Sequence, residues 1–232
     1  MYFFPAPAPF RSLRTSSFMK ALGVCLTSML TLFHSPADTF GYSMPPITIK
    51  QINSHKLLGG GAVNWRERMR SLWVERMVWI RHYIISLMMG LRDFSFVFNR
   101  ALRNGEEIAG LLSQFYGGEI ANQVENILTQ HLLILSELAT AVKAGNDITP
   151  MLPMWEGNKQ AILGQIVSYN PDADTEAWEK ILNDQFNIEM SFLMHLKQGD
   201  YETGIADFDL AHYNALRTAR TMIEGLEKQF NV

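Results

Sequence analysis

The sequence has little of what several common protein classes require. It contains one cysteine, Cys25, among 232 residues, so an intramolecular disulfide is excluded. It also lacks an excess of positive charge, because 20 Lys and Arg stand against 23 Asp and Glu, a formal net charge of -3. Proteins that bind nucleic acid usually carry a basic patch or a high isoelectric point. We therefore expect no nucleic-acid partner.

The motifs of familiar catalytic chemistry are missing as well. The glycines of Tyr116-Gly117-Gly118 are not followed by a Lys-Ser/Thr pair, so this stretch is a turn and not a phosphate loop. No serine occupies a nucleophile elbow, and the only cysteine lies near the N-terminus. The sequence gives no candidate catalytic residue and favours a non-enzymatic role.

The N-terminus has the pattern of a targeting segment. In residues 1–37, Lys20 precedes an apolar run from Ala21 to Phe33, and small residues lead to a candidate cleavage site after Ala37. The run is shorter than the ~20 residues that a membrane span needs. We expect a signal peptide and export to the cell envelope or the medium, with Met19 as an alternative start. The alternative is an uncleaved anchor that associates with a membrane.

The chain after this segment divides into a linker and a helical domain. Residues 38–64 contain Pro45, Pro46 and a run of three glycines, which predicts a flexible linker. Apolar residues make up 47% of the sequence, enough for a sizeable core. From Trp65 to Phe230 they recur every three or four residues, which is typical of α-helices. Six helical segments are expected: 65–89, 93–115, 118–146, 154–168, 175–199 and 203–230.

Local signals mark several helix ends. Gly145-Asn146 and Gly199-Asp200 predict helix C-termini, because glycine and asparagine tolerate the left-handed conformation. Asp174 before Thr175 is typical of an N-cap.

Two pairs of these segments resemble each other, which indicates an internal repeat. A shift of 54 positions places Asn104 on Asn158 and Lys143 on Lys197 without gaps. The second and third segments then form one unit, and the fourth and fifth another. We predict an all-α fold in which the first, third, fifth and sixth segments form a bundle of four long helices. The second and fourth segments would be shorter crossover helices.

Each of the four long segments has one polar residue in its apolar stripe near mid-helix: Arg76, His131, Gln185 and His212. These residues could meet at one level of the bundle. A buried polar group without a partner costs a few kcal/mol, so each needs one. The layer has three interpretations: a self-satisfied polar layer that specifies the bundle, a pocket for a small ligand or anion, or a metal site.

The metal interpretation uses histidine and carboxylate ligands, which suit a divalent cation such as Zn, Fe or Mn. The candidate ligands are His131, His212, Asp209, Glu75 and Asp184. Arg76 opposes this interpretation, because a guanidinium repels a cation and cannot ligate one. A buried ion pair of Arg76 with an aspartate, or an anion held by Arg76, is the alternative.

Several motifs resemble those of a family of small, all-helical bacterial proteins of unsettled function: Leu72-Trp73-x-Glu75-x-x-x-Trp79-x-Arg81, Leu102-x-Asn104-x-Glu106-x-Ile108, Leu128-x-x-His131 and Gln229-Phe230. The resemblance implies Glu-His pairs in the first, third and fifth segments. Here Arg76 and Gln185 replace two of those histidines, which implies that part of any family metal site is lost.

We expect, from the residues and the resemblance together, an exported binding protein for a partner protein or a small ligand. The alternative is a bundle that holds a metal or cofactor.

Overall fold

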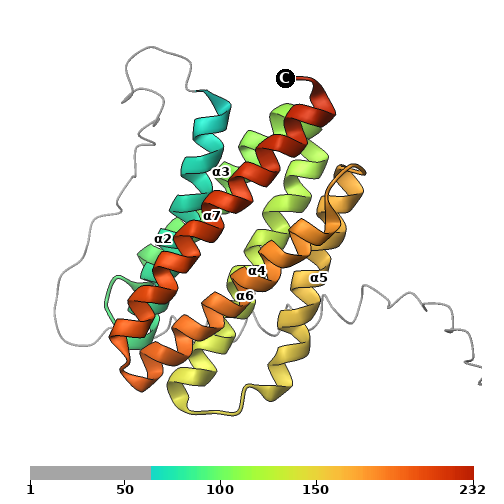
Figure 1. The fold of residues 1–232 in the computed structure, drawn as a ribbon. Helices are drawn as coiled ribbons and strands as arrows, with labels where there is room; N and C mark the ends of the chain where they lie inside the picture. Colours follow the sequence, from blue (N-terminus) through green and yellow to red (C-terminus); the bar gives the residue numbers. More distant parts are fainter. Residues whose placement is uncertain (1–63) are drawn as a thin grey trace, which may run out of the picture. The chain divides into compact units, whose positions relative to one another are not determined.

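The structure, a computed structural model, describes residues 64–232. This part of the chain is all-α and contains no strand (Figure 1). Its elements are α2 (Trp65–Met89), α3 (Phe94–Tyr116), α4 (Gly118–Ala144), the short 3-10 helix η2 (Thr149–Met151), α5 (Leu152–Tyr169), α6 (Thr175–Gln198) and α7 (Tyr201–Phe230). The expected signal peptide or anchor, the alternative start at Met19 and the linker up to residue 63 lie outside the described residues.

Local side-chain chemistry sets several helix ends where the sequence predicts them. The side chain of Asp174 accepts a hydrogen bond from the backbone N–H of Ala177 and caps α6. Gly145 and Gly199 follow α4 and α6 with φ of 78° and 75°, the left-handed conformation that closes a helix. Both predicted C-termini are confirmed.

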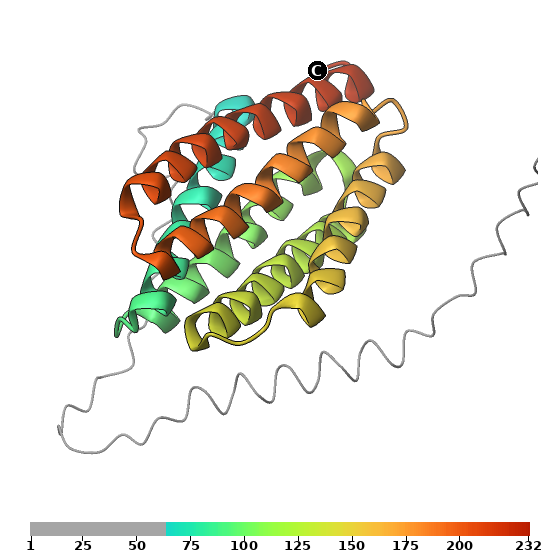
Figure 2. The same ribbon diagram turned by 60° about the horizontal axis from the view of Figure 1, so that its bottom comes forward.

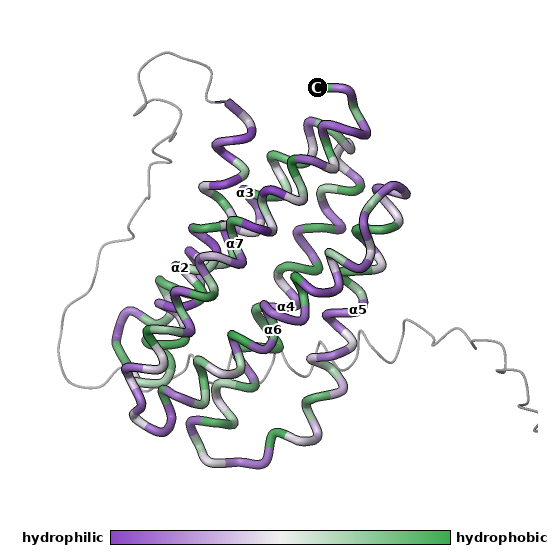
Figure 3. Tube along the Cα trace, in the orientation of Figure 1, coloured by the Kyte–Doolittle hydropathy of each residue, from purple (hydrophilic) through white to green (hydrophobic). Residues whose placement is uncertain are grey.

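The six α-helices form a closed ring. Each helix packs against its neighbours in the sequence, and α7 closes the ring by packing against both α6 and α2. Figure 2 shows α5 beside α4 and α6 on the side away from α2. Apolar and polar residues alternate along every helix (Figure 3), as expected for helices with one buried face. The bundle therefore has an interior to which every helix contributes.

Helix lengths do not confirm the predicted division into four long and two shorter crossover helices. The second segment, α3, has 23 residues and is nearly as long as α6 with 24. Only α5, with 18 residues, is markedly shorter. None of the helices between residues 64 and 232 has the length and apolarity needed to cross a bilayer.

The packing of two helix glycines gives a direct test of this arrangement. Gly110 in α3 has no atom within 4 Å of the position that a Cβ would take, whereas a Cβ at Gly225 in α7 would lie 2.7 Å from Nδ2 of Asn170. Gly110→Ala should raise the free energy of unfolding by about 0.5–1 kcal/mol, because alanine favours a helix interior. Gly225→Ala should bring no gain, since Asn170 must move.

Urea unfolding followed by circular dichroism measures both changes. Equal gains in the two variants would contradict the close approach of α7 to the turn between α5 and α6.

Candidate functional site

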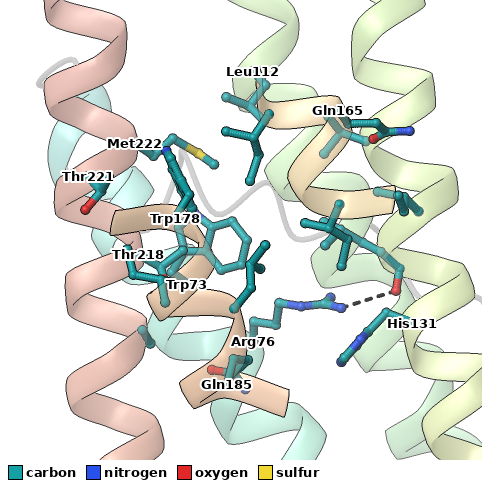
Figure 4. A pocket seen from close by; sticks show the side chains of 18 of the residues that line it. Trp73, Arg76, Leu112, His131, Gln165, Trp178, Gln185, Thr218, Thr221 and Met222 are labelled. Carbon is teal, nitrogen blue, oxygen red and sulfur yellow. Dashed lines mark hydrogen bonds between the residues drawn. The ribbon is translucent and has the colours of Figure 1, made fainter. Parts of the chain in front are cut away.

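A cavity lies inside the ring of helices, and all six α-helices contribute to its wall (Figure 4). About 110 Å³ of it is open to the centres of water molecules. One water needs about 10–15 Å³ of such space, so the cavity has room for a small organic molecule. Most of the wall is apolar and includes Trp73, Leu112, Ile127, Ile166, Trp178 and Met222. Sites for small ligands typically combine such a wall with a few polar groups.

One polar group of the cavity is the guanidinium of Arg76, which α2 places in its wall. The residue is 4% exposed, and Nη2 donates a hydrogen bond to the backbone oxygen of Leu128 at 3.2 Å (Figure 4). Burial lowers the pKa of Arg76 to about 10, and the negative charge of Glu189 opposes this shift. No carboxylate of residues 64–232 forms an ion pair with Arg76. A buried cation therefore faces the cavity without a direct counter-ion.

The second polar group is a buried pair between α4 and α6. Nε2 of His131 lies 2.9 Å from Oε2 of Glu189, and both side chains are 4% exposed. The contact is not aligned as a hydrogen bond, so Oε2 has no hydrogen-bond donor among the described residues. On the other side of the ring, Nδ1 lies 3.2 Å from Oδ1 of Asn158. The imidazole stacks on Trp155 and meets the edge of Phe186, which fixes its orientation.

Gln185 connects this pair to α7. Its Nε2 donates to Oε1 of Glu189 at 2.6 Å, and its Oε1 accepts from Nδ2 of Asn214 at 3.1 Å. Asn214 is 2% exposed and also donates to the backbone oxygen of Ile181. Arg76, His131, Gln185 and Glu189 thus form a polar group in the wall of a mainly apolar cavity, and we call these four residues the polar end.

Of the four residues expected in the polar layer, His212 does not join the others. It is exposed on α7, and so is Asp209. The buried polar positions of α7 are Asp207, Asn214 and Thr218, and residues 209 and 212 lie outside the face that they define. Asn214 contacts Gln185 in the position where His212 was expected.

The remaining metal candidates also lie apart from His131. Glu75 bridges Arg100 at 3.1 Å and Arg68 at 3.5 Å in a half-buried network on α2 and α3. Asp184 pairs with Arg217 and Lys180. The five expected ligands therefore do not converge. Within residues 64–232, no group of three or more His, Cys, Asp or Glu could hold a metal ion.

A second polar cluster brings together a serine, a histidine and an aspartate near the end of α6. Nδ1 of His195 lies 2.6 Å from Oδ2 of Asp207, while Oγ of Ser191 donates to the other carboxylate oxygen at 3.0 Å. In a catalytic triad the serine bonds to the histidine nitrogen that faces away from the aspartate. Here Ser191 and Asp207 contact the same nitrogen, with Oγ at 3.4 Å from it. The arrangement does not activate the serine as a nucleophile.

Sequence reasoning missed two residues of the site, Glu189 and Asn158. Glu189 is four positions after Gln185 and therefore shares its helix face, a spacing that could have identified it. Asn158 lies 54 positions after Asn104, the shift of the predicted repeat, and both are buried. Their shared position in the repeat was a signal that both face the interior.

Comparisons with protein-family models, with curated proteins and with solved structures found no match for this chain.

Proposed function

We propose that this protein is a binding protein that holds a small, mainly apolar molecule inside its helical bundle. The observation that supports the proposal is the central cavity, which has a mainly apolar wall and a polar end. A ligand there gains about 0.8 kcal/mol for each methylene removed from water, and the polar end fixes its direction. Catalysis is not needed to explain any residue of the cavity.

A metal-binding role is less well supported. It depends on His131, His212, Asp209, Glu75 and Asp184 acting together, and only His131 lines the cavity. Ligand binding uses Arg76, His131 and Gln185, which all line it.

Two further proposals concern the whole chain. Export follows from the targeting pattern of residues 1–37, and association with a membrane would also come from that segment.

The repeat would make α3–α4 and α5–α6 copies of one helix pair. It is supported by the buried side chains of Asn104 and Asn158 and by Lys143 and Lys197, which each donate to a backbone oxygen near the end of an earlier helix.

The full chain titrated with phenylnaphthylamine, a neutral apolar dye that fluoresces out of water, tests the proposal. Ile166 and Val167 are adjacent, half-buried residues of α5, but only Ile166 lines the cavity. Ile166→Trp should fill the cavity and weaken dye binding by about tenfold or more, a change of about 1.4 kcal/mol. Val167→Trp, the matched control, should leave dye binding unchanged.

Saturable binding to the native protein, lost only in Ile166→Trp, supports a ligand site in the cavity. Absence of saturable binding, or equal binding by the two variants, rejects it.

A further inference from the structure

We propose that the ligand of the central cavity carries one negative charge, as in an alkyl or aromatic carboxylate, and that Arg76 binds this charge. The inference rests on the proposed function and adds the chemical class of the ligand. It follows from the charges at the polar end and from their partners.

Glu189 already has partners of its own at the polar end, His131 and Gln185. Both ring nitrogens of His131 lie beside oxygen atoms, Oε2 of Glu189 at 2.9 Å and Oδ1 of Asn158 at 3.2 Å. The contacts of Glu189 thus run to His131 and Gln185 and not to Arg76.

Arg76, by contrast, has no direct ion pair among the described residues, and Glu189 acts on it only through the longer-range effect of its charge. Its guanidinium is buried, faces the cavity and forms no ion pair with a carboxylate of residues 64–232. A buried charge is costly unless a counter-ion accompanies it. The one hydrogen bond to the oxygen of Leu128 provides a dipole but no charge. A ligand anion would give the guanidinium the direct ion pair that it lacks.

The geometry of the side chain favours a carboxylate. A guanidinium is planar and donates two parallel hydrogen bonds to a carboxylate, which gives both affinity and direction. The rest of the wall is mainly apolar and suits the hydrocarbon part of the same molecule. A second negative charge on the ligand would be repelled by Glu189, which also lines the cavity. The expected class is therefore a monocarboxylate with an extended apolar body.

Competition against the bound neutral dye tests this class with ligands that differ only in the head group. Decanoate, decanol and decylamine share one alkyl chain and carry a negative, a neutral and a positive head. With the full-length native protein, decanoate should displace the dye at a concentration about tenfold lower than decanol, because charge-assisted hydrogen bonds are the stronger ones. Decylamine should be the weakest competitor.

Variants of Arg76 then assign the preference to this residue. Arg76→Met should lose the preference for decanoate over decanol, taken as the ratio of the concentrations at which the two displace the dye. Arg76→Lys keeps the positive charge but not the planar guanidinium, so it should retain part of the preference for decanoate. Arg70→Met removes an exposed arginine of the same helix and should change nothing.

The outcomes separate this inference from the proposed function. If dye binds and decanoate competes no better than decanol, the anion inference fails and the ligand site stands. If Arg76→Met still prefers decanoate, the role of Arg76 fails. If the native protein does not bind the dye at all, both proposals fail.

Discussion

Glu189→Leu is expected to lower the free energy of unfolding by about 3–5 kcal/mol, the largest effect of any single substitution considered for this protein. The carboxylate is 4% exposed and lies 2.9 Å from the imidazole of His131. Leucine has nearly the same volume but carries no charge and accepts no hydrogen bond. The buried ring of His131 would lose its carboxylate partner, and the amide of Gln185 would lose an acceptor. Urea unfolding of the full chain measures the loss.

Two control variants sharpen this experiment. Glu179→Leu removes an exposed carboxylate from the same helix, so stability should change by less than about 0.5 kcal/mol. Glu189→Gln keeps an acceptor for Gln185 but not the charge, so its cost should fall between the two. A cost for Glu189→Leu as small as that for Glu179→Leu would show that the pair with His131 contributes little.

Arg76→Met is expected to act in the opposite direction and to stabilise the ligand-free protein by about 1–2 kcal/mol. Burial lowers the pKa of Arg76 from its usual value to about 10, a difference that corresponds to about 3 kcal/mol of unfavourable free energy for the charged form. The substitution removes this cost but also the hydrogen bond to Leu128, which is worth about 1 kcal/mol. Methionine fills similar space with an apolar chain.

The sign follows from the proton balance. Below about pH 10 Arg76 is charged in both the folded and the unfolded protein, so the whole cost of burying the charge is present at neutral pH. Above about pH 10 the folded protein loses the proton before the unfolded chain does, and stability rises with pH. The gain from Arg76→Met is therefore measured at neutral pH. If Arg76→Met instead lowered the free energy of unfolding by several kcal/mol, Arg76 would stabilise the fold itself and would not be a residue kept for binding an anion.

Much of the fold could be predicted because its signals are local. The glycines after α4 and α6 and the aspartate before α6 define helix ends through the conformations and hydrogen bonds of a few residues. The apolar stripes of α2, α4 and α6 are rich in large side chains, so the spacing alone identifies their buried faces. Arg76, His131 and Gln185 interrupt these stripes. All three line the cavity.

The orientation of α7 could not be predicted in this way. Its buried face is made largely of small residues, among them Gly204, Ala211 and Ala219, which give a weak hydrophobic signal. Large apolar side chains, such as Ile205 at 56% and Tyr213 at 67%, are exposed instead. Small residues let α7 approach closely; a Cβ at Gly204 would lie 3.6 Å from the ring of Phe192. The periodicity of large residues therefore misplaced His212 and Asp209.

The pairing of charges was also beyond the sequence. Glu75 stands next to Arg76 in the chain but contacts Arg68 and Arg100, because successive helix positions point in different directions. Glu189 lies on α6 and contacts His131 on α4, a different helix. Such contacts depend on how the helices pack and not on their separate patterns.

The most direct test of the central claim is a methyl NMR titration of the full chain with decanoate after labelling of the isoleucine methyl groups. Ile127, Ile162, Ile166 and Ile181 line the cavity, whereas Ile84 and Ile205 do not. A ligand inside the bundle should shift the signals of the first four in a saturable way and leave those of Ile84 and Ile205 in place. Shifts confined to Ile205 and other exposed residues, or no saturable shift, would contradict a ligand site in the cavity.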